Sequence, residues 1–194
     1  MTQVPKEPQK TRDLILSTAL LLFAERGYFA TSVHDIRLSA ALSIGSIYHH
    51  FDSKESIART IYDDLLSRIT NVAEEAAATA TTTRGKCRAI IAALFTLAES
   101  DPLTMHFVLH ARHQEFLPEA LPICSTRPFE MMREIIADGI ASGEVRQLDP
   151  IVASAVVFGG AIRLIHLALD GVLPKPVTTY LEETVEAGWR GIAA

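Results

Sequence analysis

The residues best suited to chemistry lie in two short segments, 31–36 and 43–55, that have helical spacing and are joined by a tight turn. The second segment places Ile47 and Phe51 four residues apart, so both lie on one helical side. Its other positions carry small polar residues, a tyrosine and two histidines. Such side chains hydrogen-bond phosphate oxygens and base edges. The spacing therefore predicts a helix-turn-helix for the DNA major groove, although a helical hairpin without a DNA role has the same spacing.

The full string in this region resembles the TetR family of transcription regulators. That family's pattern is approximately T-T-x-x-D-I-A-x-x-A-G-V-S-x-G-x-L-Y-x-Y-F-x-S-K-E-x-L, and the string 23–28 is similar to its upstream A-x-x-L-F-x-x-x-G-Y/F. The resemblance covers about residues 10–60. The positions that match are Thr31, Asp35, Ile36, Ala40, Ser43, Gly45, Tyr48, Phe51, Ser53, Lys54 and Glu55, with Ile47 and Ile57 as apolar equivalents.

The resemblance implies which residues meet DNA. Contacts to phosphate are expected from Thr31, Tyr48, His49 and Lys54, and the DNA-binding set includes the predicted helix cap Ser32. Bases would face Ser43, Ile44, Gly45 and Ser46, with Arg37 as a further candidate. If Lys54 holds a phosphate, Lys54→Ala should weaken binding to every sequence and flatten its salt dependence.

The chain departs from the family pattern at three positions. Ala41 stands where glycine is usual, and a left-handed backbone there would cost about 1 kcal/mol, so a reshaped turn is expected. Ile44 replaces a polar residue and offers an apolar contact, for example to a thymine methyl. Arg37 occupies a usually small position and can supply a cation. These changes bear on the operator sequence.

The elements that position these residues all read as helices. The sequence predicts an all-α fold of about nine helices: an N-terminal three-helix DNA-binding domain and a C-terminal helical domain for ligand binding and dimerisation. A long helix is expected over 54–78, followed by helices near 84–99, 129–142, 150–169 and 177–192. The three prolines of 117–128 indicate an irregular connection. The expected division is a flexible tail at 1–9 and domains at 10–56 and 57–194.

Composition and charge limit the location and the partners. The net charge is −5, but residues 1–60 hold seven Lys/Arg and six Asp/Glu, so the acidity lies beyond the DNA-binding segment. No apolar stretch precedes Leu14, and the apolar run 151–162 is shorter than the about 20 residues that span a bilayer. We therefore expect a cytoplasmic protein without membrane contact. Cys87 and Cys124 form no CxxC pattern and are interpreted as core residues, with redox sensing by Cys124 as the alternative.

Two apolar helices near the C-terminus predict a subunit interface. The helix near 150–170 is apolar on nearly every side and contains Gly159 and Gly160, which permit close helix approach. The helix near 177–192 has a second apolar face. The resemblance implies a homodimer through these two helices. A two-fold dimer would in turn require a near-palindromic double-stranded operator.

The unusual residues of the C-terminal part suggest a sensor for a small, largely apolar molecule. His106, His110 and His113 are spaced to lie on one helical face, and His166 could approach from another helix. A metal site there is one alternative; a polar stripe beside an organic ligand or solvent is the other. Arg163 is a cation in an apolar helix, so it needs a carboxylate or an anionic ligand if buried. The remaining candidates for a ligand cavity are Phe95, Met105, Phe129, Met132 and Phe158.

The leading hypothesis is a dimeric transcription regulator, a repressor released from its operator when an apolar effector binds. A metal-responsive regulator that uses the three histidines is the alternative. An enzyme is not predicted, because no Gly-rich phosphate loop, nucleophile motif or paired carboxylates occur, and no cofactor is expected. A helical interaction module that never touches DNA would lack salt-dependent DNA affinity.

Overall fold

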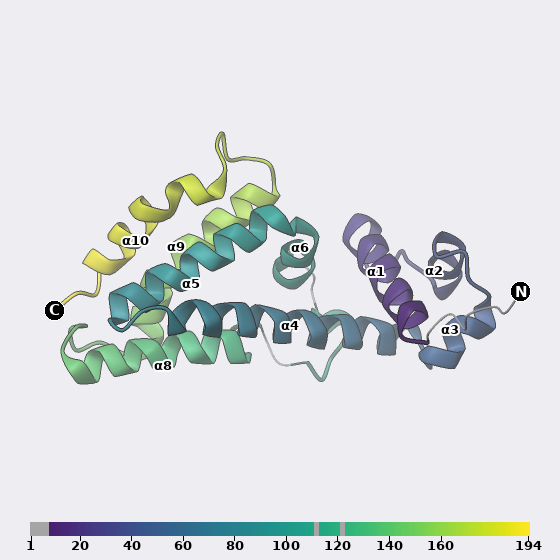
Figure 1. Cartoon of the computed structure of the whole chain (residues 1–194), viewed down its shortest axis with the longest axis horizontal. Coiled ribbons are helices and arrows are strands. Elements are labelled where there is room, and N and C mark those ends of the chain that lie inside the picture. The colour runs from purple at the N-terminus through teal and green to yellow at the C-terminus, as the bar shows by residue number, and fades with distance from the viewer. Residues whose placement is uncertain (1–7, 111–112, 121–122) are drawn as a thin grey trace, which may run out of the picture. The chain divides into compact units, whose positions relative to one another are not determined.

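The computed structural model describes residues 8–110, 113–120 and 123–194, and these residues form helices and connecting turns (Figure 1). This confirms the predicted all-α class. The α-helices are α1 (Pro8–Arg26), α2 (Val33–Ser39), α3 (Ile44–His50), α4 (Lys54–Ala78), α5 (Thr83–Ser100), α6 (Pro102–His110), α7 (His113–Phe116), α8 (Arg127–Ser142), α9 (Pro150–Leu169) and α10 (Leu181–Arg190), with 3-10 turns η1 (Ile123–Ser125) and η2 (Val177–Tyr180).

The differences from the predicted helices are local. Of the predicted tail, residues 8 and 9 belong to α1, and residues 1–7 lie outside the described part. The 3-10 turn η1 lies within the expected irregular connection, and the four-residue α7 directly precedes it. The last helix begins as the 3-10 turn η2 and becomes α-helical at Leu181. Short helices of this kind lack enough turns to show a hydrophobic period, so the sequence does not reveal them.

Contacts divide the described chain into two compact units. The first comprises the residues up to Leu65 together with His110–Ala120, and the second comprises Leu66–Leu109 and Leu121–Ala194. The segment His110–Ala120 belongs to the first unit because Phe116 stacks on Tyr28, with ring centroids 4.2 Å apart and planes inclined by 15°. Leu117 beside it is completely buried. The sequence does not predict that this segment belongs to a different unit from the helices on either side of it.

Helix caps fix the arrangement of α1, α2 and α3. Gly27 follows α1 with a φ of +84°, which only glycine adopts without strain. Ser32 caps α2: its hydroxyl accepts from the backbone N–H of Asp35 at 3.1 Å, and the Asp35 carboxylate accepts from the backbone N–H of Ser32 at 2.8 Å. Ser43 caps α3 in the same way, accepting from the backbone N–H of Ser46 at 3.0 Å. The predicted caps are therefore present.

The turn between α2 and α3 is not reshaped by its alanine. Ala41 has a φ of 53°, the left-handed region in which a glycine is usual. The backbone N–H of Leu42 still reaches the Arg37 carbonyl oxygen at 2.9 Å, so the turn is closed by a normal hydrogen bond. The expectation of a different turn is wrong: the turn keeps its geometry and the alanine bears the strain, about 1 kcal/mol.

The second unit packs α5, α8 and α10 around α9. Gly188 of α10 is required here, since a Cβ at this position would lie 3.1 Å from both the Cα and the carbonyl oxygen of Val157 in α9. Ion pairs also join α10 to α5, between Arg84 and Glu186 and between Arg88 and Glu182. Together these contacts fix the C-terminal helix along α9.

Within a single chain, α9 is buried on one side only. Ala153, Val157 and Ala161 are buried, whereas Ile151, Val152 and Val156 are exposed. By length and composition α9 could cross a membrane, because the whole 20-residue helix, as predicted from the sequence, is apolar enough, and not only its uncharged run 151–162. A core helix of a water-soluble protein has the same properties, and α9 packs on three other helices.

Candidate DNA-binding face and effector cavity

The exposed side of α3 consists of the residues that the sequence assigns to DNA bases and phosphates. Ile47 is completely buried and Phe51 is buried, whereas Ile44 and Tyr48 are 43% and 52% exposed. Ser43, Gly45 and His49 are also exposed, and Ser46 is half-buried. Both side chains therefore leave a large part of their surface available for a contact outside the chain.

Gly45 leaves open space on this face. A Cβ added at Gly45 would meet only the Ser43 hydroxyl oxygen, at 3.9 Å, and the backbone there has no positive φ. The fold therefore does not need glycine at this position. Glycine destabilises a helix by up to about 1 kcal/mol relative to alanine, and no contact within the chain requires it here. The missing side chain instead allows a partner outside the chain to approach the backbone closely.

Arg37 projects from α2 and is held by its neighbour His34. Arg37 Nε donates to His34 Nδ1 at 3.2 Å, and Arg37 Nη2 lies 3.1 Å from His34 Nε2. The guanidinium is half-buried and belongs to the same exposed region of the helix-turn-helix. This contact orients the cation without neutralising it, so Arg37 stays a candidate for phosphate or guanine.

Lys54 has a different environment from the one expected. Its Nζ donates to the carbonyl oxygens of Tyr28 and Thr31, both at 2.8 Å, and lies 4.0 Å from the centre of the Tyr28 ring. Burial lowers the pKa of this ammonium. The side chain thus ties the start of α4 to the turn between α1 and α2, and these two carbonyl groups occupy two of the three N–H donors of the ammonium.

Thr31 also points inward. It is 1% exposed, and its hydroxyl donates to the carbonyl oxygens of Gly27 at 3.0 Å and Leu22 at 3.3 Å. Leu22 lies in the last turns of α1 and Gly27 directly follows the helix. The Thr31 side chain therefore packs against the end of α1 and faces away from DNA.

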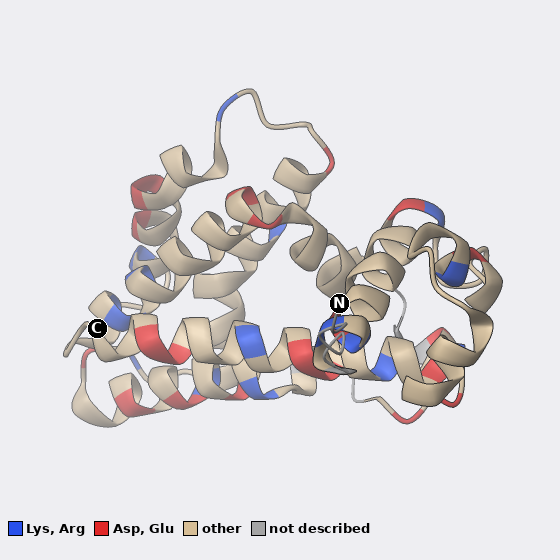
Figure 2. Ribbon diagram, turned by 45° about the vertical axis from the view of Figure 1, so that its right-hand side comes forward, with Lys and Arg blue, Asp and Glu red and all other residues tan. Residues whose placement is uncertain are grey.

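Positive charge is sparse around this face. Figure 2 shows Lys and Arg as short blue segments on several helices, with red acidic segments among them. Arg12 is already placed over the Phe51 ring at 5.5 Å. With few cations per chain, the electrostatic part of DNA affinity is small, and binding has to rely on shape, hydrogen bonds and more than one reading head.

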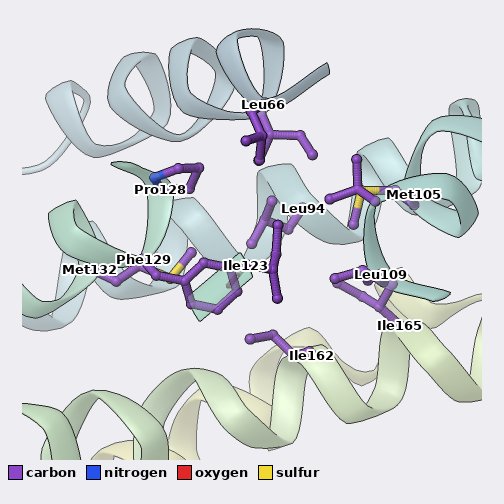
Figure 3. A pocket seen from close by; sticks show the side chains of 12 residues that line it. Leu66, Leu94, Met105, Leu109, Ile123, Pro128, Phe129, Met132, Ile162 and Ile165 are labelled. Atoms are coloured by element: carbon purple, nitrogen blue, oxygen red, sulfur yellow. The ribbon is translucent and has the colours of Figure 1, made fainter. Parts of the chain in front are cut away.

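The second unit encloses an apolar cavity of about 30 Å³ (Figure 3). Its walls come from α4, α5, α6, α8, α9 and the turn η1, and all 12 lining residues are apolar. Three of the predicted ligand residues, Met105, Phe129 and Met132, line it. An apolar residue on a helix gives the same sequence signal whether it faces a cavity or the core, so the sequence does not identify the other lining residues. These are Leu66, Ile69, Leu94, Val108, Leu109, Ile123, Pro128, Ile162 and Ile165.

Comparison with known proteins decides the family. Residues 15–61 match the "Bacterial regulatory proteins, tetR family" domain, and residues 62–194 match the "Tetracyclin repressor-like, C-terminal domain". The chain belongs to the TetR family. It is a DNA-binding transcription regulator and not an enzyme.

The TetR relatives include several repressors. The HTH-type transcriptional repressor KstR2 of Mycolicibacterium smegmatis is 32% identical over 146 residues, which is 73% of this chain and 71% of that protein. KstR2 of Rhodococcus jostii is 51% identical over 61 residues, 29% of this chain and 30% of that one. Among solved structures, FadR of Bacillus subtilis in complex with stearoyl-CoA has a TM-score of 0.79 at 22% identity, covering 93% of this chain and 98% of that chain.

Four other predicted ligand residues of this TetR chain lie in the second unit but do not line the apolar cavity. Phe95 is completely buried and does not line the cavity. Phe158 lines a second chamber beside Phe129 and Met132. Arg163 is exposed, so the expected buried cation is not present within one chain. His166 is half-buried, with Nδ1 2.8 Å from the Ile162 carbonyl oxygen of its own helix.

The three predicted stripe histidines do not form a described metal centre. His106 and His110 are half-buried and fall in different units, and the side chain of His113 lies outside the described residues. Among the residues that are described, no group of three His, Cys, Asp or Glu side chains could hold a metal ion. Cys87 is buried, and burial together with the charge of Glu144 raises its thiol pKa to about 12, as suits an inert core residue. The side chain of Cys124 also lies outside the described residues.

Proposed function

We propose that this chain is a homodimeric repressor that leaves its operator when a largely apolar effector binds the second unit. The observation that carries the proposal is the exposed side of α3, where Ile44, Gly45 and Tyr48 have no role in the core. The relatives named as repressors support the direction of regulation. A cytoplasmic location follows from this role, because the operator is there.

The proposed DNA interface is the predicted one without its two inward-facing members. Ser43, Ile44, Gly45 and Ser46 face bases; Tyr48 and His49 face phosphates; Arg37 reaches either; and Ser32 exposes a helix start at which backbone N–H groups can meet phosphate. Thr31 and Lys54 support this set from behind. Phosphate contacts fix the register of the protein on DNA, and base contacts determine the sequence.

The exposed apolar side of α9 supports dimerisation. Ile151, Val152 and Val156 would be unusual on the surface of a monomer, and a groove of about 370 Å³ runs between α9 and α10 beside Gly160 and Gly188. A second copy that buries this side makes a two-fold dimer. Its two α3 helices would enter successive major grooves about 34–36 Å apart, so the operator should be a near-palindrome.

The apolar cavity supports the class of effector. Its walls have no polar group to recognise a hydrophilic molecule, while FadR of Bacillus subtilis was solved with stearoyl-CoA and KstR2 of Mycobacterium tuberculosis is named a ketosteroid transcriptional regulator. The cavity is about 30 Å³, far below the roughly 300 Å³ or more of a pocket for a small ligand. Helices must therefore move apart on binding, which favours the state that releases DNA.

The experiment that tests this function is a selection of genomic DNA by the purified protein, followed by footprinting. We expect one or a few near-palindromic sites, each protected over two successive major grooves by two chains or a multiple of two. Recovery of random fragments, or protection of a single half-site by one chain, would contradict the proposal.

A further inference from the structure

The contact between Arg37 and His34 on α2 requires an uncharged histidine. Arg37 Nε donates to His34 Nδ1 at 3.2 Å, and Arg37 Nη2 lies 3.1 Å from His34 Nε2. A guanidinium can only donate hydrogen bonds, whereas an imidazolium has no acceptor nitrogen. The ring of His34 is therefore neutral when this contact exists, whichever of its two nitrogens is the acceptor.

The histidine occupies one edge of the Arg37 guanidinium and leaves the other edge open. Nε and Nη2 form the side-on edge of an arginine, and both face the imidazole. The end-on edge consists of Nη1 and the second N–H of Nη2, and it has no hydrogen-bond acceptor among the residues that the structure describes. Two such N–H groups match N7 and O6 of guanine in the major groove. His34 thus fixes the plane of the guanidinium while an edge suited to a base stays available.

The charged groups beside this contact do not change charge near neutral pH. Arg37 and Arg26, which ends α1, stay protonated. Hydrogen bonds from the side chain and backbone of Ser32, together with the charge of Arg26, lower the pKa of the Asp35 carboxyl, so Asp35 stays ionised and keeps its place in the α2 cap. Histidine is the side-chain type that changes charge between about pH 5 and 8. A proton taken up in this range therefore alters the contact and leaves the cap intact.

We propose that Arg37 reads a guanine of the operator through its end-on edge and that neutral His34 is the residue that positions it. A base contact depends on the plane of the guanidinium, which is what His34 fixes. Protonation of His34 replaces the acceptor by an N–H group and places a second cation beside Arg37. The contact is then lost, so low pH should weaken the preference for guanine and strengthen binding to DNA of any sequence. This inference rests on the proposed DNA interface.

Fluorescence anisotropy on a selected operator, with each base pair of the site replaced in turn, tests this assignment. Measurements at about pH 8 and about pH 5.5 cover the range in which histidine changes charge. At the higher pH, Arg37→Met should reduce the preference for one G·C pair of each half-site roughly tenfold and leave the preferences at the other positions. In the unchanged protein, the same preference should fall at the lower pH while the affinity for scrambled DNA rises.

Variants of His34 separate positioning from charge. His34→Ala removes the acceptor and should weaken the preference for the same base pair at both pH values. His34→Gln supplies an amide oxygen that can accept from a guanidinium and does not titrate, so this variant should keep the preference at both pH values. Rescue by glutamine and not by alanine would show that the histidine acts through its acceptor.

A histidine of α3 provides the matched control. α3 packs on α2, and its His49 and His50 rings lie against each other with centroids 5.2 Å apart. His49→Gln removes a titratable group from the DNA-binding face and should change the affinity for all sequences alike. The preference at the base pair read by Arg37, and its dependence on pH, should be those of the unchanged protein.

Three results would overturn the proposal: an Arg37→Met variant that loses affinity equally on every sequence, a His34→Ala variant with unchanged preferences, or a preference in the unchanged protein that is the same at both pH values. Thermal unfolding at both pH values shows whether each variant is folded. Failure to select any operator would reject the proposed function and this inference with it, whereas these three results concern only the ranking of base pairs within a bound site.

Discussion

At the scale of residues, Ala41 and Gly45 of the helix-turn-helix each occupy a position that would suit the other residue type within the fold. Ala41 keeps a left-handed backbone that suits glycine, so its side chain is strained within the fold. Gly45 occupies an ordinary helical position where a larger residue would fit, so its lack of a side chain serves something outside the fold. Each can be tested by exchanging the two residue types.

Gly45→Ala should separate folding from DNA binding. Alanine is the better helix former, so the free energy of unfolding should stay unchanged or rise by up to about 1 kcal/mol. The added methyl group fills the space available to DNA, and operator affinity should fall roughly tenfold, an effect of about 1.4 kcal/mol. Urea unfolding and fluorescence anisotropy on operator DNA measure the two effects. Unchanged affinity would place DNA elsewhere.

Ala41→Gly should stabilise the protein. It relieves a left-handed alanine, worth about 1–2 kcal/mol, and this gain is partly offset by the greater freedom of glycine in the unfolded chain. We expect a net increase of up to about 1 kcal/mol in urea unfolding. The neighbour Ala40 has a φ of −81°, so Ala40→Gly is a matched control and should destabilise. A loss of stability in both variants would mean that Ala41 is not strained.

Lys54→Met distinguishes a structural lysine from a phosphate-binding one. Removing the ammonium leaves the carbonyl groups of Tyr28 and Thr31 without this donor, which should destabilise the first unit by about 1–3 kcal/mol. The salt dependence of operator binding, measured where the variant is folded, should keep its slope. A slope smaller by about 0.9 for each bound chain would instead show that Lys54 neutralises a phosphate, as the sequence pattern predicts.

At the scale of elements, the segment after α6 packs on the first unit mainly through the Phe116 ring, which contacts Tyr28 and Phe29. Phe116 stacks on Tyr28, whose backbone carbonyl accepts from Lys54 and from the backbone N–H of Thr31. The preceding helix α6 supplies Met105, Val108 and Leu109 to the apolar cavity of the second unit.

Phe116→Ala should loosen the turn between α1 and α2 first. Loss of a buried, stacked phenylalanine costs about 3 kcal/mol or more. Hydrogen exchange at the backbone N–H of Thr31 should accelerate, while exchange in α10 should remain as in the unchanged protein. If exchange increases equally in both places, the stack stabilises the whole chain and not this turn in particular.

The elements also show what the sequence can and cannot predict. The caps Ser32 and Ser43 and the long helix α4 were predictable because capping residues and helical periods are local signals. The inward direction of Thr31 and Lys54 was not, since it depends on carbonyl groups in the last turns of α1 and in the turn after it, whose positions the family pattern does not give.

At the scale of the whole molecule, the account requires two copies of the chain. The sparse positive charge of one DNA-binding face and the exposed apolar side of α9 point to the same arrangement, in which two weak reading heads act together. Two half-sites on one duplex make binding far tighter than one head could, provided that the dimer spaces them correctly.

Val156→Glu should convert the dimer to monomers. Val156 is exposed in the single chain and lines the groove between α9 and α10, so a carboxylate there would be buried without a partner in the dimer. Sedimentation velocity should show the monomer, and operator affinity should fall with it. Val172→Glu is a matched control in the exposed loop after α9 and should leave the dimer intact. A Val156→Glu protein that is still dimeric would place the interface elsewhere.

DNA reading by α3 is tested by fluorescence anisotropy of the protein on a selected genomic site and on a scrambled version, at two salt concentrations. We expect specific binding by two chains or a multiple of two, weakened by salt and reduced roughly tenfold by Gly45→Ala. Equal affinity for both sequences at either salt concentration would contradict the claim that the exposed side of α3 reads DNA.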